Sequence, residues 1–339
     1  MLQLVNKSPF KATIALFPNE KGIDTLYTII KATFIINTKL EVAEEQMPIV
    51  MADEYWGEPG QSSLKYASEM HLSKPSTDIV MIGEACVPDK QPVTELAVSL
   101  KVGNKEKTVL VFGDRQWEKS FMSLRKSEPV AFESMPMTFE RAYGGTHVID
   151  PETNKIVYEE LNPVGVGFNG KKTKKEIDGS PLPNLENPAK LINNAKDRPT
   201  PTCFGFVAPS WEPRKSFAGT YDEAWQKKRA PYLPEDFDSR FFNSASSGLI
   251  MDKHLKGGEP VTIMNMSAKG PIMFNLPQCE FDLNVDIDKK IEKPELNMET
   301  VLLEPNKQSF SMLWRAAVEC DKKALKVNEI NINLNKMQL

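Results

Sequence analysis

The side chains that could most readily take part in a reaction or bind a metal form a short acidic run near the end of a proline-rich stretch. Glu235, Asp236 and Asp238 stand beside Arg240 in the segment PEDFDSR. Carboxylates at this spacing would suit a divalent cation or general acid and base chemistry. Such a run more often caps backbone amides in a turn and pairs with a neighbouring arginine. The sequence therefore favours a structural turn, and a hydrolase-like or metal-dependent enzyme is the alternative.

Histidine and cysteine add little support for an enzyme. His71, His147 and His254 are far apart, so a zinc or iron site would have to be assembled from distant segments. Cys203 would be a nucleophile only with a histidine close in space, and a buried apolar cysteine is the commoner case. The chain has no G-x-S-x-G, H-E-x-x-H or Walker lysine motif. We therefore predict no catalytic residue, no metal and no cofactor.

One glycine pattern resembles a dinucleotide loop. Gly165, Gly167 and Gly170 match G-x-G-x-x-G in the segment NPVGVGFNG. In a nucleotide-binding fold this pattern follows a strand and opens an apolar helix. Here Pro163 stands where the strand would end, and KKTKKE follows in place of the helix. The pattern predicts an ordered glycine loop without a nucleotide.

Aromatic rings beside arginines are the remaining candidates. Trp, Tyr and Arg are enriched at protein interfaces because each joins a large apolar area to a polar end. The alternative is that they fasten the proline-rich stretch to a sheet by stacking and charge-assisted hydrogen bonds. The candidate partner-binding residues are Arg115, Trp117, Arg141, Tyr143, Trp211, Tyr221 and Trp225.

The first of these candidates stand at the end of a predicted hairpin. Apolar and polar residues alternate over 95–102, which is the period of a strand with one buried face. Gly103 and Asn104 suit a tight turn, and 108–112 (TVLVF) suits the returning strand. Arg115 and Trp117 then follow where the strand leaves the sheet. We expect them at the rim of the fold, partly buried and held by hydrogen bonds.

Further strands are predicted on both sides of the proline-rich stretch. The segment 27–37 (YTIIKATFIIN) is apolar on both faces, which favours a central strand. In the last segment the apolar phase changes near Asn328, which predicts a bulge or a turn. Other strands are predicted at 79–85, from 261, at 280–287 and at 310–318. The fold class is therefore mainly β, with antiparallel sheets in a two-lobed sandwich or barrel-like unit.

Prolines concentrate in the middle of the chain. Thirteen of the 25 lie between Pro129 and Pro234, which predicts ordered loops with short helices. Brief helices are expected at 185–195 and 220–229, the second capped by Thr220 and stopped by Pro231. The predicted division is an N-terminal β lobe at 1–150, an irregular middle at 151–245 and a C-terminal β lobe at 246–339. The three parts could also form one structural unit.

Charge and hydropathy limit the classes of partner. The 339 residues carry 42 basic and 46 acidic side chains, a net charge of −4, so neither nucleic acid nor an anionic membrane is an expected partner. The first residues lack a secretory signal pattern, and no run is apolar enough to span a membrane. The four cysteines are widely spaced, as in reduced proteins. We expect a cytoplasmic protein, and the sequence predicts no particular oligomeric state.

Several segments together resemble a bacterial family. The similarity covers roughly the first 320 residues, and its longest block, 218–245, is specific. The segments are KATF at 31–34, KPSTD at 74–78, GEACVP at 83–88, VGNKEKTVLVFGDRQW at 102–117, MPMTFERAYGG at 135–145, NPVGVGF at 162–168 and AGTYDEAWQKKRAPYLPEDFDSRFFNSA at 218–245. They resemble a family, formerly of unknown function, whose genes lie beside those for type VI secretion tip proteins.

The resemblance implies an adaptor or chaperone. Such a protein would bind an effector, usually one joined to a PAAR-type tip domain, and assist its loading onto the VgrG spike. No catalytic residue is implied by the family. A structural component that travels with the tip is a further alternative, and it would appear in the secreted fraction.

Overall fold

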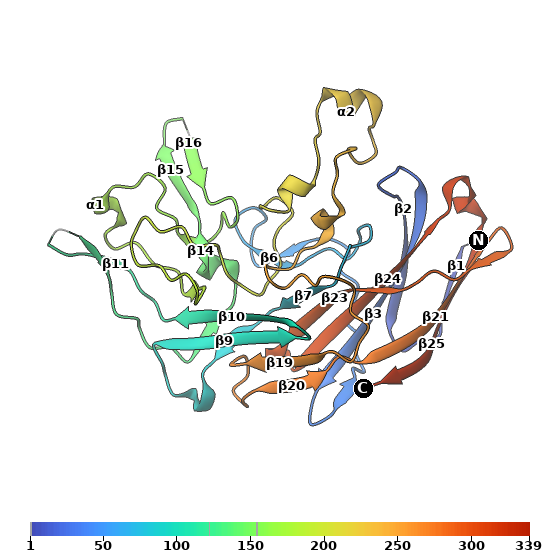
Figure 1. Ribbon diagram of the computed structural model, residues 1–339, viewed down its shortest axis with the longest axis horizontal. Coiled ribbons are helices and arrows are strands. Elements are labelled where there is room, and N and C mark those ends of the chain that lie inside the picture. Colours follow the sequence, from blue (N-terminus) through green and yellow to red (C-terminus); the bar gives the residue numbers. More distant parts are fainter. Residues whose placement is uncertain (1, 122, 154) are drawn as a thin grey trace.

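The computed structural model describes residues 2–121, 123–153 and 155–339, and these are mainly β (Figure 1). The largest sheet, called the central sheet here, has the strand order β2-β3-β24-β23-β7, and β4 also pairs with β3. Its strands are β2 (Lys11–Pro18), β3 (Asp24–Ile36), β4 (Leu40–Val42), β7 (Asp78–Met81), β23 (Asn297–Glu304) and β24 (Ser309–Glu319). Strands from both ends of the chain therefore share one sheet.

β3 is the central strand that its sequence predicts. It pairs antiparallel with β2 on one side and with β24 on the other. Most of its residues are buried because both faces of the sheet are covered. Antiparallel pairing is the rule in this structure, but β23 and β7 pair in parallel. A parallel pair needs a long crossover, and here the middle of the chain supplies it.

Two smaller sheets pack on one face of the central sheet. The first has the order β1 (Gln3–Asn6), β25 (Val327–Gln338), β21 (Gln278–Ile287) and β22 (Lys290–Glu292). The second has the order β18 (Leu185–Glu186), β10 (Lys105–Phe112), β9 (Glu95–Val102), β19 (Pro260–Met264) and β20 (Ile272–Asn275). Phe281 of the first meets Trp314 of the central sheet, and Phe274 of the second stacks on Phe310. The sheets stay open, so the fold is a sandwich rather than barrel-like.

Most of the local predictions for the strands are confirmed, but the single strand predicted at 79–85 is divided between β7 and a second short strand, β8 (Glu84–Cys86). β9 and β10 form a hairpin whose turn is Gly103 and Asn104, and Gly103 has a φ of 56°. In β25 the register against β21 passes from Glu329 directly to Val327. Asn328 is therefore the extra residue of a bulge at the predicted position.

Short strand pairs, turns and loops lie outside these three sheets. The pairs are β5 (Glu54–Tyr55) with β6 (Leu64–Tyr66), β8 (Glu84–Cys86) with β13 (Ser134–Pro136), β11 (Trp117–Lys119) with β12 (Leu124–Lys126), β14 (Tyr143–Gly144) with β17 (Val166–Gly167), and β15 (Thr146–Asp150) with β16 (Lys155–Tyr158). Short 3₁₀ turns occur at Pro88–Lys90, Phe139–Arg141, Lys215–Phe217, Ser239–Phe242, Pro305–Lys307 and Asp321–Lys326. None of the helices in these described parts is long and apolar enough to cross a membrane.

The two helix predictions have different outcomes. The α-helices described are α1 (Lys174–Ile177) and α2 (Glu223–Lys228). The prediction at 185–195 is wrong, because the first two of these residues pair with β10 as β18. The prediction at 220–229 is confirmed as α2, but Asp222 caps it, accepting a hydrogen bond from the Trp225 amide at 2.8 Å. Thr220 instead bonds to Asp236.

The predicted lobes are joined by shared sheets. β3 and β24 are neighbours although one lies within 1–150 and the other within 246–339. β19 likewise extends the sheet of β9 and β10. One continuous apolar core lies between the sheets, and a smaller second cluster surrounds Trp117. The first and last parts of the chain therefore share these two sheets and one apolar core.

Candidate functional site

An arm of residues 218–238 projects from the body of the molecule, with α2 near its tip (Figure 1). α2 buries none of its residues. Tyr221 is 53% exposed, and its ring meets that of Trp225 edge to face at 4.7 Å. The Trp225 indole Nε1 donates to the Tyr232 carbonyl oxygen at 2.8 Å. The arm is thus ordered by its own contacts while its aromatic residues stay accessible.

The acidic run predicted as a turn forms the neck of this arm. The Thr220 amide and hydroxyl donate to the two carboxylate oxygens of Asp236 at 2.9 and 2.7 Å. These bonds hold the pKa of Asp236 below its usual value. Arg240 donates to Asp238, whose pKa is also lowered by that bond. Both acids therefore have local structural partners, as the favoured interpretation of the sequence predicts.

The arm also reaches across to the β2–β3 hairpin. Arg229 donates from Nη2 to the Glu20 carbonyl oxygen at 2.6 Å. The Tyr232 ring lies against Gly22, where an added Cβ would be only 3.1 Å from the ring. Gly22 also has a φ of 81°, which favours glycine. The tip of the hairpin and the arm therefore support one another.

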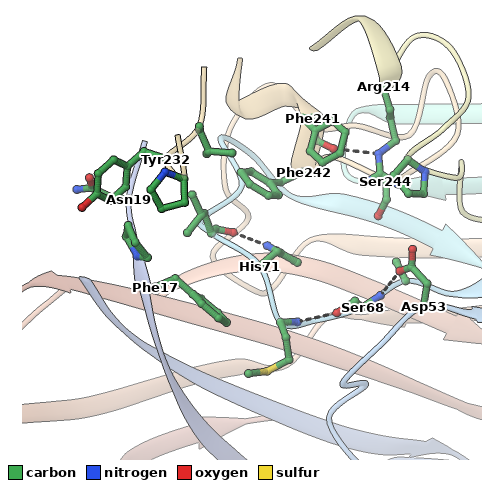
Figure 2. Close-up of a pocket in the computed structure, with 17 residues that line it drawn as sticks. Phe17, Asn19, Asp53, Ser68, His71, Arg214, Tyr232, Phe241, Phe242 and Ser244 are labelled. Carbon is green, nitrogen blue, oxygen red and sulfur yellow. Dashed lines mark hydrogen bonds between the residues drawn. The ribbon is translucent and has the colours of Figure 1, made fainter. Parts of the chain in front are cut away.

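A groove of about 500 Å³ lies at the base of the arm (Figure 2). Four segments line most of it, namely 17–19, 67–72, 231–233 and 241–244. Its floor is a small apolar cluster in which Phe17, Met70, Leu233 and Phe242 pack against Tyr27 and its buried neighbours. A concave, mainly apolar site with a few polar groups is typical of a binding site.

His71 is one of the polar groups in the groove. Its ring stacks on Phe242 with the centroids 5.5 Å apart. Its Nδ1 is hydrogen-bonded to the Leu72 carbonyl oxygen and must therefore carry a proton. Burial is the main cause that lowers the pKa of His71 well below its usual value, and the charges of Arg315 and Lys74 add to it. The ring is thus neutral at physiological pH.

Arg214 is the cation of the groove. Its Nε donates to the Phe241 carbonyl oxygen at 2.9 Å and its Nη1 to the Val207 carbonyl oxygen at 2.6 Å. The guanidinium also lies 5.2 Å from the centre of the Phe241 ring. Burial lowers the pKa of Arg214, while the charges of Asp78 and Asp53 oppose this shift. Among the described residues, no carboxylate forms an ion pair with Arg214.

Four of the predicted partner-binding residues are buried, and the prediction is wrong for them. Arg115 is 6% exposed and pairs with Glu186 at 2.7 Å. Trp117 and Tyr143 are 2% and 3% exposed and lie in the second apolar cluster. Trp211 is 4% exposed and meets Phe139 edge to face. These side chains fasten the middle of the chain to the sheets, and burial prevents contact with a partner.

The other three predicted residues remain accessible. Tyr221 and Trp225 lie together on the arm, as described above. Arg141 has a side chain that is 37% exposed and donates to the Asn184 side chain at 3.0 Å, outside the arm and its groove. Of the accessible candidates, the structure therefore brings two together, Tyr221 and Trp225. Arg214 stands three residues after the candidate Trp211 in the sequence. His71, Phe17 and Phe242 belong to separate segments and were not predicted.

Two other sequence features have structural roles. A Cβ on Gly165 would lie 2.6 Å from the Ala142 carbonyl oxygen, so this glycine allows two chain segments to approach closely. The motif thus runs through β17, which pairs with β14, and into the loop after it, and it opens no helix at this point. Cys203 is fully buried, and burial raises the pKa of its thiol to about 11. Among the described residues, no three His, Cys, Asp or Glu side chains converge as metal ligands would.

The chain matches a protein family over most of its length. Residues 21–315 match the family described as "Uncharacterized protein conserved in bacteria (DUF2169)". The chain belongs to the DUF2169 family. The match includes the arm, most of the groove and most strands of the central sheet, and the groove segment 17–19 lies before it. No curated protein and no solved structure matches this DUF2169 chain.

Proposed function

We propose that this DUF2169 protein is a cytoplasmic adaptor that binds another folded protein through the arm and the groove beside it. The observation that supports this most directly is the arm itself. It is ordered, it buries no residue of α2, and it holds the exposed Tyr221 ring against the half-buried Trp225 ring. Aromatic residues held in place before binding lose little conformational entropy on association.

The proposed partner is a type VI secretion effector or its PAAR-type tip domain. The specific block 218–245, which carries the resemblance to an adaptor family, coincides with the arm and its neck. In this proposal the adaptor assists loading of the effector onto the VgrG spike and then stays behind. The proposal needs no catalytic residue, metal or cofactor, because the adaptor acts only by binding.

Substitution on the arm tests the proposal. The double variant Tyr221→Ala with Trp225→Ala removes the paired rings of the arm without opening the core. The matched control is Trp56→Ala with Tyr158→Ala, since these rings are 45% and 40% exposed outside the arm. We expect the arm variant to recover at least roughly 10-fold less effector in co-purification from the native host, identified by mass spectrometry, because aromatic residues often dominate binding. The control variant should recover the normal amount.

Two outcomes would count against the proposal. Normal delivery of every tip-linked effector in a deletion strain would refute the adaptor role. Appearance of the protein in the secreted fraction would favour a structural tip component instead.

The enzyme alternative predicts a different result. An enzyme using Glu235, Asp236 and Asp238 would lose function on alanine substitution of all three while still capturing its partner.

A further inference from the structure

The polar end of the groove contains an arginine with unused donors. Two backbone carbonyl oxygens, those of Phe241 and Val207, fix the guanidinium of Arg214. Its Nη2 donates to no described residue, and it is not among the buried polar atoms without a partner, so solvent reaches it. A planar guanidinium held in one orientation is well suited to bind a carboxylate.

The charges around Arg214 leave room for a further anion. Asp78 and, in the same groove, Asp53 help to keep Arg214 charged, but neither forms an ion pair with it. Asp78 pairs with Lys74 at 2.6 Å. One oxygen of Asp53 instead accepts a hydrogen bond from the Ser68 amide at 2.7 Å. A partly desolvated cation without a direct counter-ion gains more from a carboxylate than an exposed cation does.

The rest of the groove is apolar and adjoins the arm. Phe17, Met70 and Phe242 offer a surface for a large apolar side chain. Figure 2 shows Arg214, Asp53 and Ser244 toward one end and Phe17 and Tyr232 toward the other. Tyr232 belongs both to the arm and to the groove, so a chain that contacts the arm can continue into the groove.

We propose that the groove binds a segment of the partner polypeptide by an apolar side chain and an adjacent carboxylate, and that Arg214 binds this carboxylate. The inference rests on the proposed function, since it takes the ligand to be a protein. The carboxylate can come from an Asp or Glu side chain or from a chain terminus. The two sources present the same chemistry to Arg214 and are distinguished below.

Short peptides test the inference with the full-length protein. The acetylated peptide Leu-Phe-Glu with an amidated end supplies a side-chain carboxylate, and acetylated Leu-Phe with a free end supplies a terminal one. The controls are Leu-Phe-Gln amide and Leu-Phe amide. By titration calorimetry we expect at least one acid peptide to bind about 10-fold more tightly than its neutral control, a typical effect of a charge-assisted pair.

Variants assign the effect to the groove. Arg214→Lys keeps the charge but loses the planar fork, so the advantage of the acid peptide should fall several-fold or disappear. Phe17→Ala should weaken acid and neutral peptides alike, and it leaves the bonds of Arg214 to the backbone in place. The matched control is Arg240→Gln, because Arg240 also stacks on a phenylalanine but lies at the exposed neck. This control should bind as the unchanged protein does.

The results that would overturn the groove inference differ from those that would overturn the adaptor proposal. Equal binding of acid and neutral peptides, or no saturable binding up to roughly 5 mM, would overturn the inference. Tighter binding of dodecanoate than of either acid peptide would point to a lipid ligand and would also overturn it. If the peptides fail while an effector still co-purifies through Tyr221 and Trp225, the groove inference falls and the adaptor proposal stands. If acid peptides bind through Arg214 but the host yields no effector, the adaptor proposal falls instead.

Discussion

At the scale of single residues, burial decides what an arginine beside an aromatic ring can do. Arg115 and Arg214 have similar sequence surroundings, each close to a tryptophan. Arg115 is paired with Glu186 inside the fold, where it fastens β18 to the end of β10. Arg214 has only carbonyl partners and lines an open groove. The same residue type thus has a structural role at one position and an available charge at the other.

His71 makes stability depend on pH. Its pKa in the folded protein is lowered well below 6.5, so the unfolded chain binds the proton more tightly. The contribution of His71 to the free energy of unfolding should therefore be constant above about pH 6.5 and fall below it, by at most about 1.4 kcal/mol per pH unit. His71→Asn keeps a donor near the Leu72 carbonyl but cannot titrate. Urea unfolding at pH 7.5 and 5.5 should show a smaller fall for this variant.

The control for this experiment is His147→Asn. His147 accepts a hydrogen bond from the Lys171 amide at 3.2 Å, away from the groove. This variant should keep the decline of the unchanged protein. A decline that persists undiminished in His71→Asn would assign the effect to other groups.

At the scale of elements, the arm depends on the hairpin that it touches. Segment 218–238 has few buried side chains, so its position relies on the neck and on the contacts with Glu20 and Gly22. Segments with few buried contacts open most readily. The β2–β3 hairpin is long and paired along its whole length. It therefore provides a firm support for the tip of the arm.

Gly22→Ala should loosen the arm. The new Cβ would meet the Tyr232 ring at 3.1 Å and would adopt an unfavourable positive φ of 81°. Gly60→Ala is the matched control, because its φ is 79° and an added Cβ meets nothing within 4 Å. Brief trypsin digestion reports opening at Lys227 and Lys228. We expect cleavage there to rise roughly 5- to 30-fold in Gly22→Ala, as for a loss of 1–2 kcal/mol, and to stay unchanged in the control. Equal rates in both variants would exclude support by the hairpin.

At the scale of the whole molecule, buried ion pairs connect distant parts of the chain. Lys31 of β3 pairs with Glu69 at 2.7 Å, and the Glu69 carbonyl oxygen accepts a bond from Arg315 of β24. Arg315 pairs with Glu299 of β23 at 2.7 Å, and the Lys74 amide donates to the other oxygen of Glu299. This chain of contacts lies beside the groove. It joins the first third of the sequence to the last strands.

Glu299→Gln should therefore destabilise the whole protein. Glu299 and Arg315 are each 1% exposed, so removing one charge leaves the other buried and unpaired. Such losses cost about 3–5 kcal/mol. The control is Glu295→Gln, whose partner Lys256 lies 2.8 Å away in a pair that is 69% and 71% exposed. Thermal and urea unfolding should separate the two variants clearly, since exposed pairs contribute little. Similar unfolding midpoints would mean that the buried pair is not stabilising.

The sequence by itself determined the elements whose signal is local. The alternation at 95–102, the turn at Gly103 and the phase change at Asn328 each predicted the observed structure. These features depend on a residue and its near neighbours in the strand, because side chains in a strand alternate between two faces. The acidic turn at the neck and the helix at 220–229 are of the same kind. Their residues and partners lie within one short segment.

Only the tertiary structure decided which candidate side chains are accessible. Arg115 and Trp117 are buried because the middle of the chain folds over them, and Arg214 is available because four separate segments leave a groove beside it. The pairing of β7 with β23 likewise joins strands more than two hundred residues apart. Solvent access and contacts of this kind depend on how distant segments pack. Composition and periodicity describe a segment alone, so they contain no information on what covers it.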